Sequence, residues 1–295
     1  MLNDAEPIPT KCTITYGKKY VIIITILEKT KTGGTNMFRD EFQNVCNGAK
    51  GKVKLLNTNP FGYFVAAIVA GIFIAFGGFV TFTIGGYLTA SGETMTKVIT
   101  SASFAAALSL VVMAGAELFT GNNFVMASAS FAGEVKWSDT IRLWVICYIG
   151  NLLGSLLAAV LFHFTGIPTG AVGEFFANTA AAKMSGRALN LFMKALFCNT
   201  LVCIAVWCGF KMKSESGKLI MIFWCIYVFM VCGFEHSIAN MTAMAVGLLD
   251  PNGVAGITIG GYVHNLLWVT LGNMAGGIFF VAWPYYMIQK NKENK

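Results

Sequence analysis

Long runs without charged residues dominate the order of apolar and polar positions along this chain. A predominantly apolar segment of about 20 residues can span the roughly 30 Å hydrocarbon core of a bilayer. Six segments reach this length once two polar interruptions are bridged: Phe61 to about Ala90, Val98 to about Ala132, about Leu143 to Phe162, about Leu189 to Phe210, Leu219 to about Leu249, and about Asn265 to Ile288. We therefore expect six transmembrane helices in one compact unit.

The composition agrees with this pattern. Hydrophobic residues make up 56% of the 295 residues and charged residues 12%, about half the charged share of a typical soluble domain. Disorder, collagen and coiled coil are excluded as descriptions of the whole chain, and an ordinary cytosolic enzyme is disfavoured. The eight cysteines include no CxxC pair, so we expect most of their thiols to pack as small apolar residues.

The distribution of lysine and arginine predicts the orientation. From residue 37 onward, 12 such residues fall on one side of the predicted spans and 3 on the other, namely Lys97, Lys183 and Arg187. Cytoplasmic loops carry the excess positive charge. We therefore expect the protein to lie in the cytoplasmic (inner) membrane with both termini in the cytoplasm. Residues 37–60 then form a cytoplasmic segment, 61–288 the six-helix domain and 289–295 a cytoplasmic tail. The net charge of +7 needs no nucleic-acid partner to explain it.

Residues 1–36 are predicted to be a disordered upstream extension outside the natural protein. Their apolar run, Tyr20–Leu27, is too short to span a bilayer and unlike a signal peptide. A purine-rich ribosome-binding sequence can encode the pair Gly33-Gly34, and Met37 follows at a suitable spacing. We expect translation to start at Met37; finding residues 1–36 on protein made from its own locus would contradict this.

Two short motifs recur in the same order along the chain. The pattern G-x-E-x-x-x-x-N occurs at 115–122 and again 118 residues later, and G-N-x-x-G occurs at 150–154 and again 122 residues later. Each copy contains three spans, an odd number, so the second copy is predicted to be inverted, as in many transporters and channels. The first motif interrupts spans two and five. We expect two broken helices there rather than kinks closed by packing, because non-helical backbone at that depth must be buried in protein or line a wet cavity.

The two interruptions contain the candidate functional residues. His236 lies in the second and Thr120 in the first. An ionisable side chain this deep marks a pathway by default, and a hydrogen-bonded structural histidine is the alternative. Four polar neighbours are expected to hold the broken loops, the two carboxylates by accepting backbone N–H bonds: Glu117, Asn122, Glu235 and Asn240.

Two lysines near the outer side are expected to have different roles. Lys183, between spans three and four, is either merely solvated or placed at a pore mouth, where it raises the local concentration of anions. Lys194, near the start of span four, is expected to extend its charged end to the surface. The GxSxG, GxGxxG and P-loop patterns are absent, and the three histidines lack metal-ligand spacing. We therefore expect no enzyme activity, metal or cofactor.

At these motifs the sequence resembles the formate–nitrite transporter family, whose members conduct formate, nitrite or hydrosulfide. The likeness rests on residues 117–120, on 233–241 around His236 and on Gly272-Asn273, and it covers roughly residues 40–290. Aquaporins have a similar helix arrangement but carry Asn-Pro-Ala in both breaks, which this chain lacks. The resemblance implies an all-α, aquaporin-like membrane fold with six transmembrane helices, arranged as an inverted 3+3 repeat in which helices two and five are broken. It also implies a homopentamer with one pore in each protomer.

The resemblance further implies which residues line the pore. Thr120, His236 and Asn199 take central polar positions, and Lys183 matches the lysine of the outer vestibule. The constrictions are expected at Leu108, Leu118, Phe229, Phe104 and Val202. One departure is Asn190, where the family often has an acidic residue; with Lys194 one turn further on, the outer approach is more positive than usual.

The expected function is conduction of a small monovalent weak-acid anion, which crosses the apolar constriction as the neutral acid. An unpaired anion there faces a penalty of several kcal/mol, whereas protonation by water or by His236 removes the charge. Hydrosulfide is attractive because its acid has a pKa near neutrality, and formate and nitrite stay open. A proton-coupled secondary monocarboxylate transporter and a non-transporting receptor or scaffold are the alternatives. Membrane lipid is the other expected partner.

Overall fold

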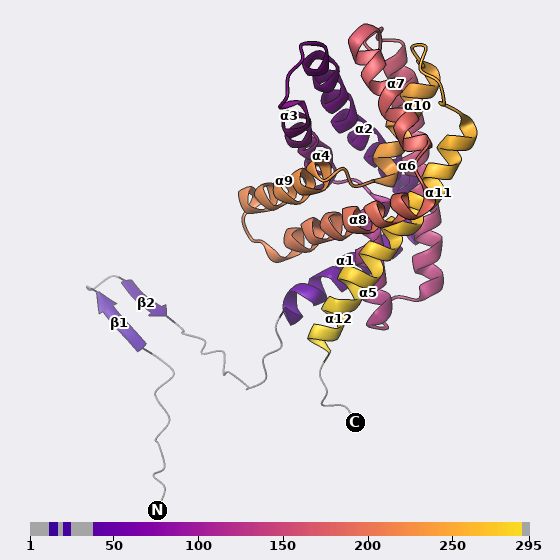
Figure 1. The fold of residues 1–295 in the computed structure, drawn as a ribbon. Coiled ribbons are helices and arrows are strands. Elements are labelled where there is room, and N and C mark those ends of the chain that lie inside the picture. The colour runs from indigo at the N-terminus through magenta and orange to yellow at the C-terminus, as the bar shows by residue number, and fades with distance from the viewer. Residues whose placement is uncertain (1–11, 17–19, 25–37, 291–295) are drawn as a thin grey trace, which may run out of the picture. The chain divides into compact units, whose positions relative to one another are not determined.

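The computed structural model describes residues 12–16, 20–24 and 38–290, and the chain divides into two compact units, Met1–Asn36 and Met37–Lys295. In the first unit, β1 (Cys12–Tyr16) and β2 (Tyr20–Ile24) pair antiparallel, with Cys12 opposite Ile24 and Tyr16 opposite Tyr20 (Figure 1). Their β-branched residues favour extended backbone. Apart from these two strands, residues 1–36, the predicted upstream extension, lie outside the described part of the chain.

The second unit begins with α1 (Arg39–Thr58), which lies in the segment predicted to be cytoplasmic. Phe42, Val45, Cys46 and Ala49 are buried on one face of this helix, and their spacing of three and four residues is that of an amphipathic helix. Burial raises the pKa of the Cys46 thiol to about 12. The helix packs mainly against α5 (Phe119–Phe131) and α2 (Pro60–Ala90), which lie within the membrane domain.

α1 also makes polar contacts with Glu134, which lies in the connection between α5 and α6 (Trp137–His163). Its carboxylate pairs with Lys50 at 2.5 Å and accepts a hydrogen bond from Gln43 at 3.1 Å. The Lys50 hydrogen bond and, to a smaller extent, the one from Gln43 lower the pKa of Glu134, against the opposing effect of burial. α1 is thus fixed to the membrane domain by polar as well as apolar contacts.

The membrane domain is all-helical within the described residues. Five stretches are long and apolar enough to cross a bilayer: α2 (Pro60–Ala90), α3 (Thr96–Ser103) with α4 (Ala105–Ala114), α6 (Trp137–His163), α8 (Ala188–Lys211), and α11 (Ile259–Gly277) continued by the π-helical turn η1 (Ile278–Ala282) and α12 (Trp283–Gln289). The third and sixth predicted spans therefore start about six residues too late. A further helix, α7 (Gly170–Met184), occupies the connection between α6 and α8.

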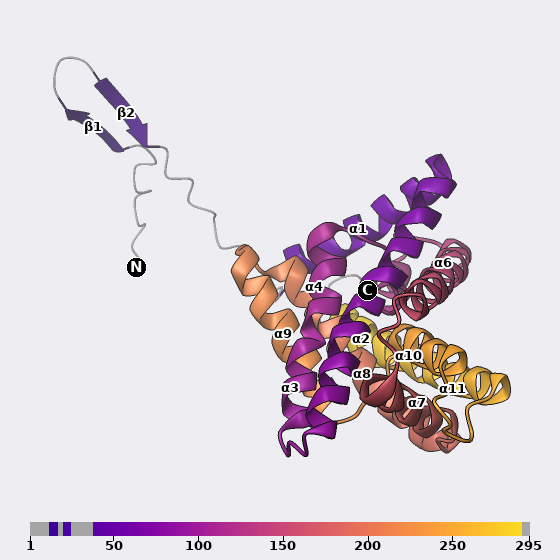
Figure 2. The same ribbon diagram turned by 90° about the horizontal axis from the view of Figure 1, so that it is seen from above.

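Helical structure stops at both predicted interruptions. The first break, Gly115–Leu118, separates α4 from α5 (Phe119–Phe131), and the second, Cys232–His236, separates α9 (Glu215–Val231) from α10 (Ser237–Leu249). α9 and α10 are each shorter than a full span, and together they occupy the fifth predicted span. Gly115 and Gly233 have φ angles of 79° and 69°, a left-handed conformation that only glycine adopts without strain. In Figure 2, α3, α4 and α9 lie on the opposite side of α2 from α6, α7, α10 and α11.

Two close helix pairs hold this arrangement together. α6 packs against α2 and α11 packs against α8. A Cβ atom at Gly154 would overlap the carbonyl oxygen of Ile68 on α2, and one at Gly276 would overlap the carbonyl oxygen of Leu196 on α8. Small residues at such contacts let membrane helices approach backbone to backbone.

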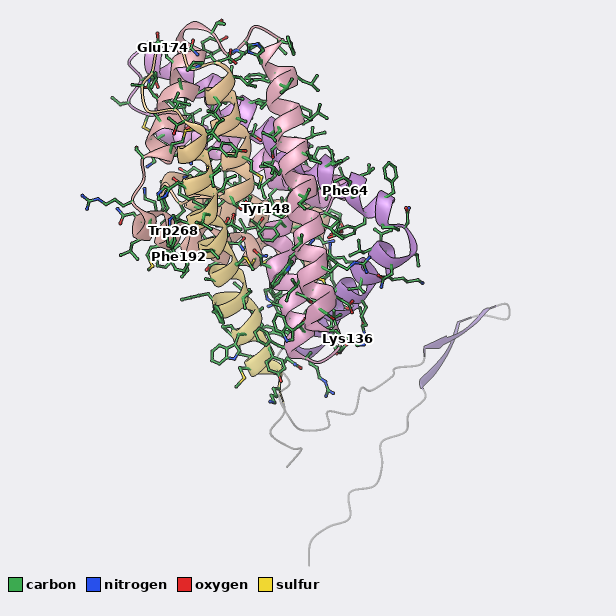
Figure 3. The ribbon with its side chains drawn as sticks, turned by 90° about the vertical axis from the view of Figure 1, so that its right-hand side faces the viewer. Phe64, Lys136, Tyr148, Glu174, Phe192 and Trp268 are labelled. Atoms are coloured by element: carbon green, nitrogen blue, oxygen red, sulfur yellow. The ribbon has the colours of Figure 1, made fainter. Side chains whose placement is uncertain are left out.

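The side chains that point away from these pairs are mostly apolar. Figure 3 shows them along α6 and α11, with Tyr148 between the two helices, where its hydroxyl group is hydrogen bonded to Thr270 at 2.9 Å. Exposed apolar side chains on α6 include Val145, Ile149, Leu153 and Leu161. A surface of this kind fits lipid or another protomer.

Gly154→Ala is expected to lower the free energy of unfolding by about 1–3 kcal/mol, because the added methyl group overpacks the contact with α2. Gly209→Ala is the matched control: it lies in α8, a Cβ there meets no atom within 4 Å, and the change should be neutral or stabilise by up to about 1 kcal/mol. Thermal unfolding of both variants in detergent measures the difference. Equal melting temperatures would show that the α2–α6 contact tolerates a larger residue.

Candidate functional site

The first helix break is held by the side-chain amide of Asn151. This residue lies on α6 and is fully buried. Its Oδ1 accepts the N–H of Phe119, the first residue of α5, at 2.9 Å, while its Nδ2 donates to the carbonyl oxygens of Glu117 at 2.9 Å and Ala67 at 2.7 Å. A single amide therefore satisfies one backbone group within the break and one at the start of α5, and joins both to α2.

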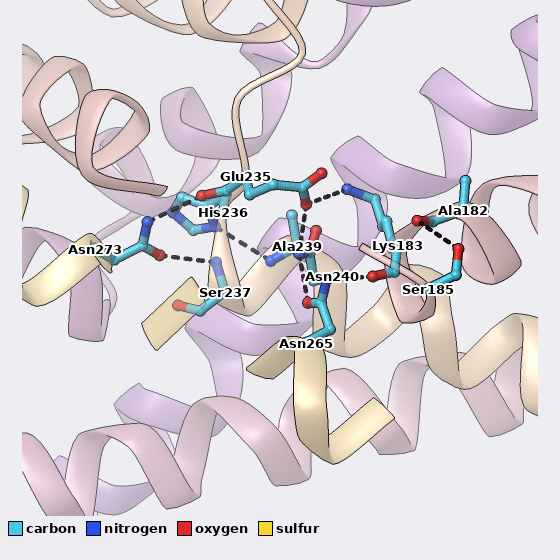
Figure 4. Close-up of polar contacts among 10 residues, drawn as sticks. All are labelled: Ala182, Lys183, Ser185, Glu235, His236, Ser237, Ala239, Asn240, Asn265 and Asn273. Carbon is cyan, nitrogen blue, oxygen red and sulfur yellow. Dashed lines mark hydrogen bonds and ion pairs between the residues drawn. The ribbon is translucent and has the colours of Figure 1, made fainter. Parts of the chain in front are cut away.

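The second break is held in the same way by Asn273 on α11 (Figure 4). Its Oδ1 accepts the N–H of Ser237, the first residue of α10, at 2.9 Å. Its Nδ2 donates to the carbonyl oxygens of Glu235 at 2.9 Å and Ala195 at 2.8 Å. The sequence analysis used Asn151 and Asn273 as markers of the repeat without giving them a role, although their equal placement in both copies was the available signal.

The carboxylates of the two breaks bind lysine ammonium groups. Glu117 accepts from Lys52 on α1 at 2.6 Å and from the Asn122 amide at 2.9 Å. The sequence analysis expected Glu117 to accept backbone N–H bonds and did not identify Lys52, which lies 65 residues away in the chain. Because the N–H of Phe119 donates to Asn151, the carboxylate of Glu117 remains available to pair with the ammonium group of Lys52.

Glu235 has the corresponding partners in the second break. Its carboxylate accepts from Lys183 on α7 at 2.7 Å and from the Asn240 amide at 2.7 Å (Figure 4). Asn240 also donates to Asn265 on α11, whose amide donates to the carbonyl oxygen of Lys183 at 2.9 Å. Lys183 is thus a partly buried member of an ion pair rather than a freely solvated lysine.

Thr120 and His236 meet between the breaks. Thr120 Oγ1 lies 3.0 Å from His236 Nε2, and both residues are buried. His236 Nδ1 accepts the backbone N–H of Ala239 at 3.2 Å and so caps α10. Because Nδ1 accepts a hydrogen bond, the neutral imidazole carries its proton on Nε2 and donates it to Thr120.

Asn199 lies next to this pair without contacting its side chains. Its amide donates to the carbonyl oxygens of Thr120 at 3.2 Å and Asn273 at 2.7 Å. It therefore connects the backbone of one half of the domain to that of the other. Asn199 and Thr120 were both predicted to lie at the centre of the pore. Neither residue lines any of the three cavities in this part of the molecule, which are described below.

Three cavities follow one another past His236. We name the cavity beside Lys183 the outer cavity and the one beside Lys52 the inner cavity, after the orientation predicted from the distribution of positive charge. The outer cavity has a volume of about 240 Å³ and the inner one about 400 Å³, and between them lies a middle cavity of about 10 Å³. Phe104, Phe229 and His236 line both the outer and the middle cavities, and Leu108 and Leu118 line both the middle and the inner ones. The middle cavity has room for about one water molecule.

The middle cavity is apolar apart from His236. Its lining comprises Ile74, Phe104, Ala107, Leu108, Leu118, Val202, Ile226, Phe229 and His236, which includes all five residues predicted for the constrictions. The rings of Phe104 and Phe229 meet edge to face with centroids 6.0 Å apart. Ile74, Ala107 and Ile226 were not identified from the sequence, because a buried aliphatic residue in a membrane helix carries no distinguishing signal.

Both large cavities carry charged side chains. Lys183, Glu235 and Lys97 line the outer cavity, and Lys52 and Glu117 line the inner one. A further open cavity of about 730 Å³ adjoins the outer one and is lined by Lys194 and Glu174, among others. Lys194 is exposed, in line with the expectation that its charged end reaches the surface. Within the described ranges, no group of three or more His, Cys, Asp or Glu side chains is placed to hold a metal ion.

Comparison with known proteins gives a consistent result. The description "Formate/nitrite transporter" belongs to a family profile that matches residues 39–287. The nitrite transporter NirC of Escherichia coli is 35% identical over 251 residues, which are 85% of this chain and 92% of that protein. Among solved structures, an FNT family ion channel superposes with a TM-score of 0.79 at 33% identity, covering 84% of this chain and 98% of the other.

A second solved structure, a pentameric formate channel with formate bound, superposes with a TM-score of 0.66 at 30% identity and covers 77% of this chain and 96% of the other. The FNT family channel match spans nearly the whole of its own chain as well. These relatives are transporters and channels, and the apolar helices described above are those of a multi-pass membrane protein. The chain, from α1 to the last helix of the domain, belongs to the formate/nitrite transporter family.

Proposed function

We propose that this protein conducts small monovalent weak-acid anions, namely hydrosulfide, formate or nitrite, across the cytoplasmic membrane. The observation that carries the proposal is the middle cavity, a space of about 10 Å³ with apolar walls and one histidine between two cavities that each carry a lysine. Nitrite and formate are the solutes in the names of its relatives. We also propose a homopentamer, since one similar structure is pentameric.

The proposed topology has six crossings in an inverted 3+3 repeat. α3 and α4 with α5 form one broken crossing, and α9 with α10 form the other. The matched asparagines, carboxylates and lysines of the two breaks support this arrangement, because each half supplies the same contacts in the same order. By the distribution of positive charge, both termini face the cytoplasm.

The size and polarity of the middle cavity support passage of the solute as the neutral acid. An anion that left its hydration shell behind would meet Phe104, Phe229, Leu108 and Leu118 with no countercharge, at a penalty of several kcal/mol. The cavity has no room for an anion with its water. A solute that gains a proton from water in the outer or inner cavity, or from Nε2 of His236 while the ring takes up a replacement proton from water at Nδ1, enters as an uncharged molecule. Hydrogen sulfide, with one heavy atom, fits this space best, and formic and nitrous acids have three.

A proton-coupled secondary monocarboxylate transporter is the second candidate. The observation that favours it is the small volume of the middle cavity, about 10 Å³ between two larger cavities, which a conformational alternation would widen toward each side in turn. Saturating flux and uphill uptake driven by a pH gradient would distinguish it from a channel.

Stopped-flow measurement on the purified protein in liposomes tests the proposal, with hydrosulfide, formate, nitrite and chloride compared side by side. Flux of the three weak-acid anions with chloride excluded is the expected result, because hydrochloric acid is too strong to supply a neutral form. Absence of any solute flux would favour a receptor or scaffold instead.

His236→Asn is expected to lower formate flux at neutral pH by about 10²-fold, the lower end of what a positioned proton donor contributes. The loss should shrink toward pH 5, where formate takes up protons from water more readily. Thr120→Ser keeps the hydroxyl group and serves as the matched control, with near-normal flux. The measurement is formate flux in liposomes between pH 5 and 8; an unchanged pH profile in His236→Asn would leave the histidine a structural role only.

Phe229→Ala and Leu108→Ala are expected to widen the middle cavity and admit larger monocarboxylates. The flux of acetate or lactate relative to formate should rise about tenfold or more, the usual effect of changing the fit of a small apolar pocket. Phe223→Ala is the control, since this residue lies on α9 with Phe229 but lines none of the three cavities. Selectivity equal to that of the control would exclude Phe229 and Leu108 from the conduction path.

A further inference from the structure

The outer and inner cavities have matching ion pairs but different net charges. Each is lined by one lysine–glutamate pair, Lys183–Glu235 outside and Lys52–Glu117 inside, with N–O distances of 2.7 and 2.6 Å. The outer cavity is lined in addition by Lys97. Its charged lining therefore sums to one positive charge, whereas that of the inner cavity sums to zero.

Lys97 lies in the first turn of α3 with its ammonium group close to the second helix break. A Cβ atom at Gly233 would lie 3.6 Å from Lys97 Nζ, an ordinary contact distance, so the ammonium group lies directly beside the backbone of this glycine. The backbone carbonyl oxygen of Lys97 accepts a hydrogen bond from the Ser101 hydroxyl group, one turn further along α3, at 2.6 Å. Among the residues that the structure describes, no carboxylate lies within ion-pair distance of Lys97.

The position that corresponds to Lys97 in the second repeat carries the opposite charge. Lys97 stands 18 residues before Gly115, and Glu215 stands 18 residues before Gly233. Glu215 pairs with Lys218 at 3.0 Å and lines a separate pocket beside the inner cavity, not the inner cavity itself. The two repeats thus share their ion pairs and differ at this helix start.

We propose that Lys97 is a second anion-holding residue of the outer cavity and makes the protein bind its anion more tightly from the outer side than from the inner side. The outer side is the one that bears Lys97, Lys183 and Arg187, and the proposal rests on the anion conduction proposed above. Glu235 neutralises Lys183, so Lys97 supplies the net charge that concentrates anions in the cavity. The inner cavity, with Lys52 balanced by Glu117, has no such charge.

This asymmetry changes saturation and not the direction of net transport. A fixed charge does no work, so a passive conductor with equal solute on both sides carries equal flux in each direction. Tighter binding of the anion on the outer side lowers the half-saturating concentration for influx. It also lowers the maximum influx rate, because the bound anion leaves the site more slowly. Efflux into solute-free solution leaves the outer site nearly empty, so its half-saturating concentration is set by the inner cavity.

The test compares Lys97→Gln with wild type in liposomes that contain the full chain in one known orientation. Formate influx and efflux are measured into solute-free compartments at equal pH on both sides. Lys97→Gln should raise the half-saturating concentration for influx about threefold to fivefold, the effect of one exposed charge, and leave that for efflux unchanged. The difference should shrink between about 0.1 and 1 M salt, as the Debye length falls from about 10 to about 3 Å.

Two control variants make the result specific. Lys97→Arg keeps the charge and should behave as wild type. Arg187→Gln removes an exposed outer charge that lines neither large cavity and should leave both half-saturating concentrations unchanged. An equal shift for influx and efflux in Lys97→Gln, no shift at all, or the same shift in Arg187→Gln would overturn the role of Lys97. Absence of flux in wild type would instead overturn the proposed function.

Discussion

The structure depends on how the backbone groups freed at two helix breaks are satisfied inside a membrane. A buried N–H or C=O group without a partner costs about 1–3 kcal/mol in a protein interior, and hydrocarbon offers no water to replace the partner. Asn151 and Asn273 each accept one N–H and donate to two carbonyl oxygens, one in the break and one on a neighbouring helix. With those groups satisfied, the chain can interrupt two membrane helices and bring His236 and Thr120 together.

Because the asparagine amides satisfy the backbone groups at the breaks, the two glutamate carboxylates are available to bind lysine ammonium groups. Glu117 and Glu235 each hold a lysine at the border of a large cavity, at distances of 2.6 and 2.7 Å. Each lysine is partly buried and keeps a carboxylate partner, which avoids the penalty of an isolated charge in low dielectric. The resulting order along the path is a charged cavity, an apolar space with one histidine, and a second charged cavity. That order suits a solute that is charged in water and neutral at the centre.

Much of this could be predicted from the sequence, and the rest could not for a physical reason. Hydrophobic runs identify the spans because the bilayer fixes their length, and the repeated glycine–glutamate–asparagine motif locates both breaks. Thr120, His236 and the constriction residues followed from the motifs and the family resemblance. Lys52 and Lys97 were counted only as topology signals, because their contacts join segments far apart in the chain. The prediction that Glu117 and Glu235 accept backbone N–H bonds was wrong for the same reason. The asparagines that accept N–H groups at the breaks in their place lie on other helices.

The cap that His236 forms on α10 has a consequence for bioenergetics. Its Nδ1 is engaged by the N–H of Ala239, so the ring cannot turn over to pick up a proton on one face and release it on the other without giving up the start of a helix. Nε2 already bears the proton that is donated to Thr120, so a proton given up there is replaced only at Nδ1, after the Ala239 hydrogen bond has opened. An imidazole held in this way forms no proton wire through the bilayer while the cap on α10 is closed, and leakage of the proton-motive force through the histidine itself is limited.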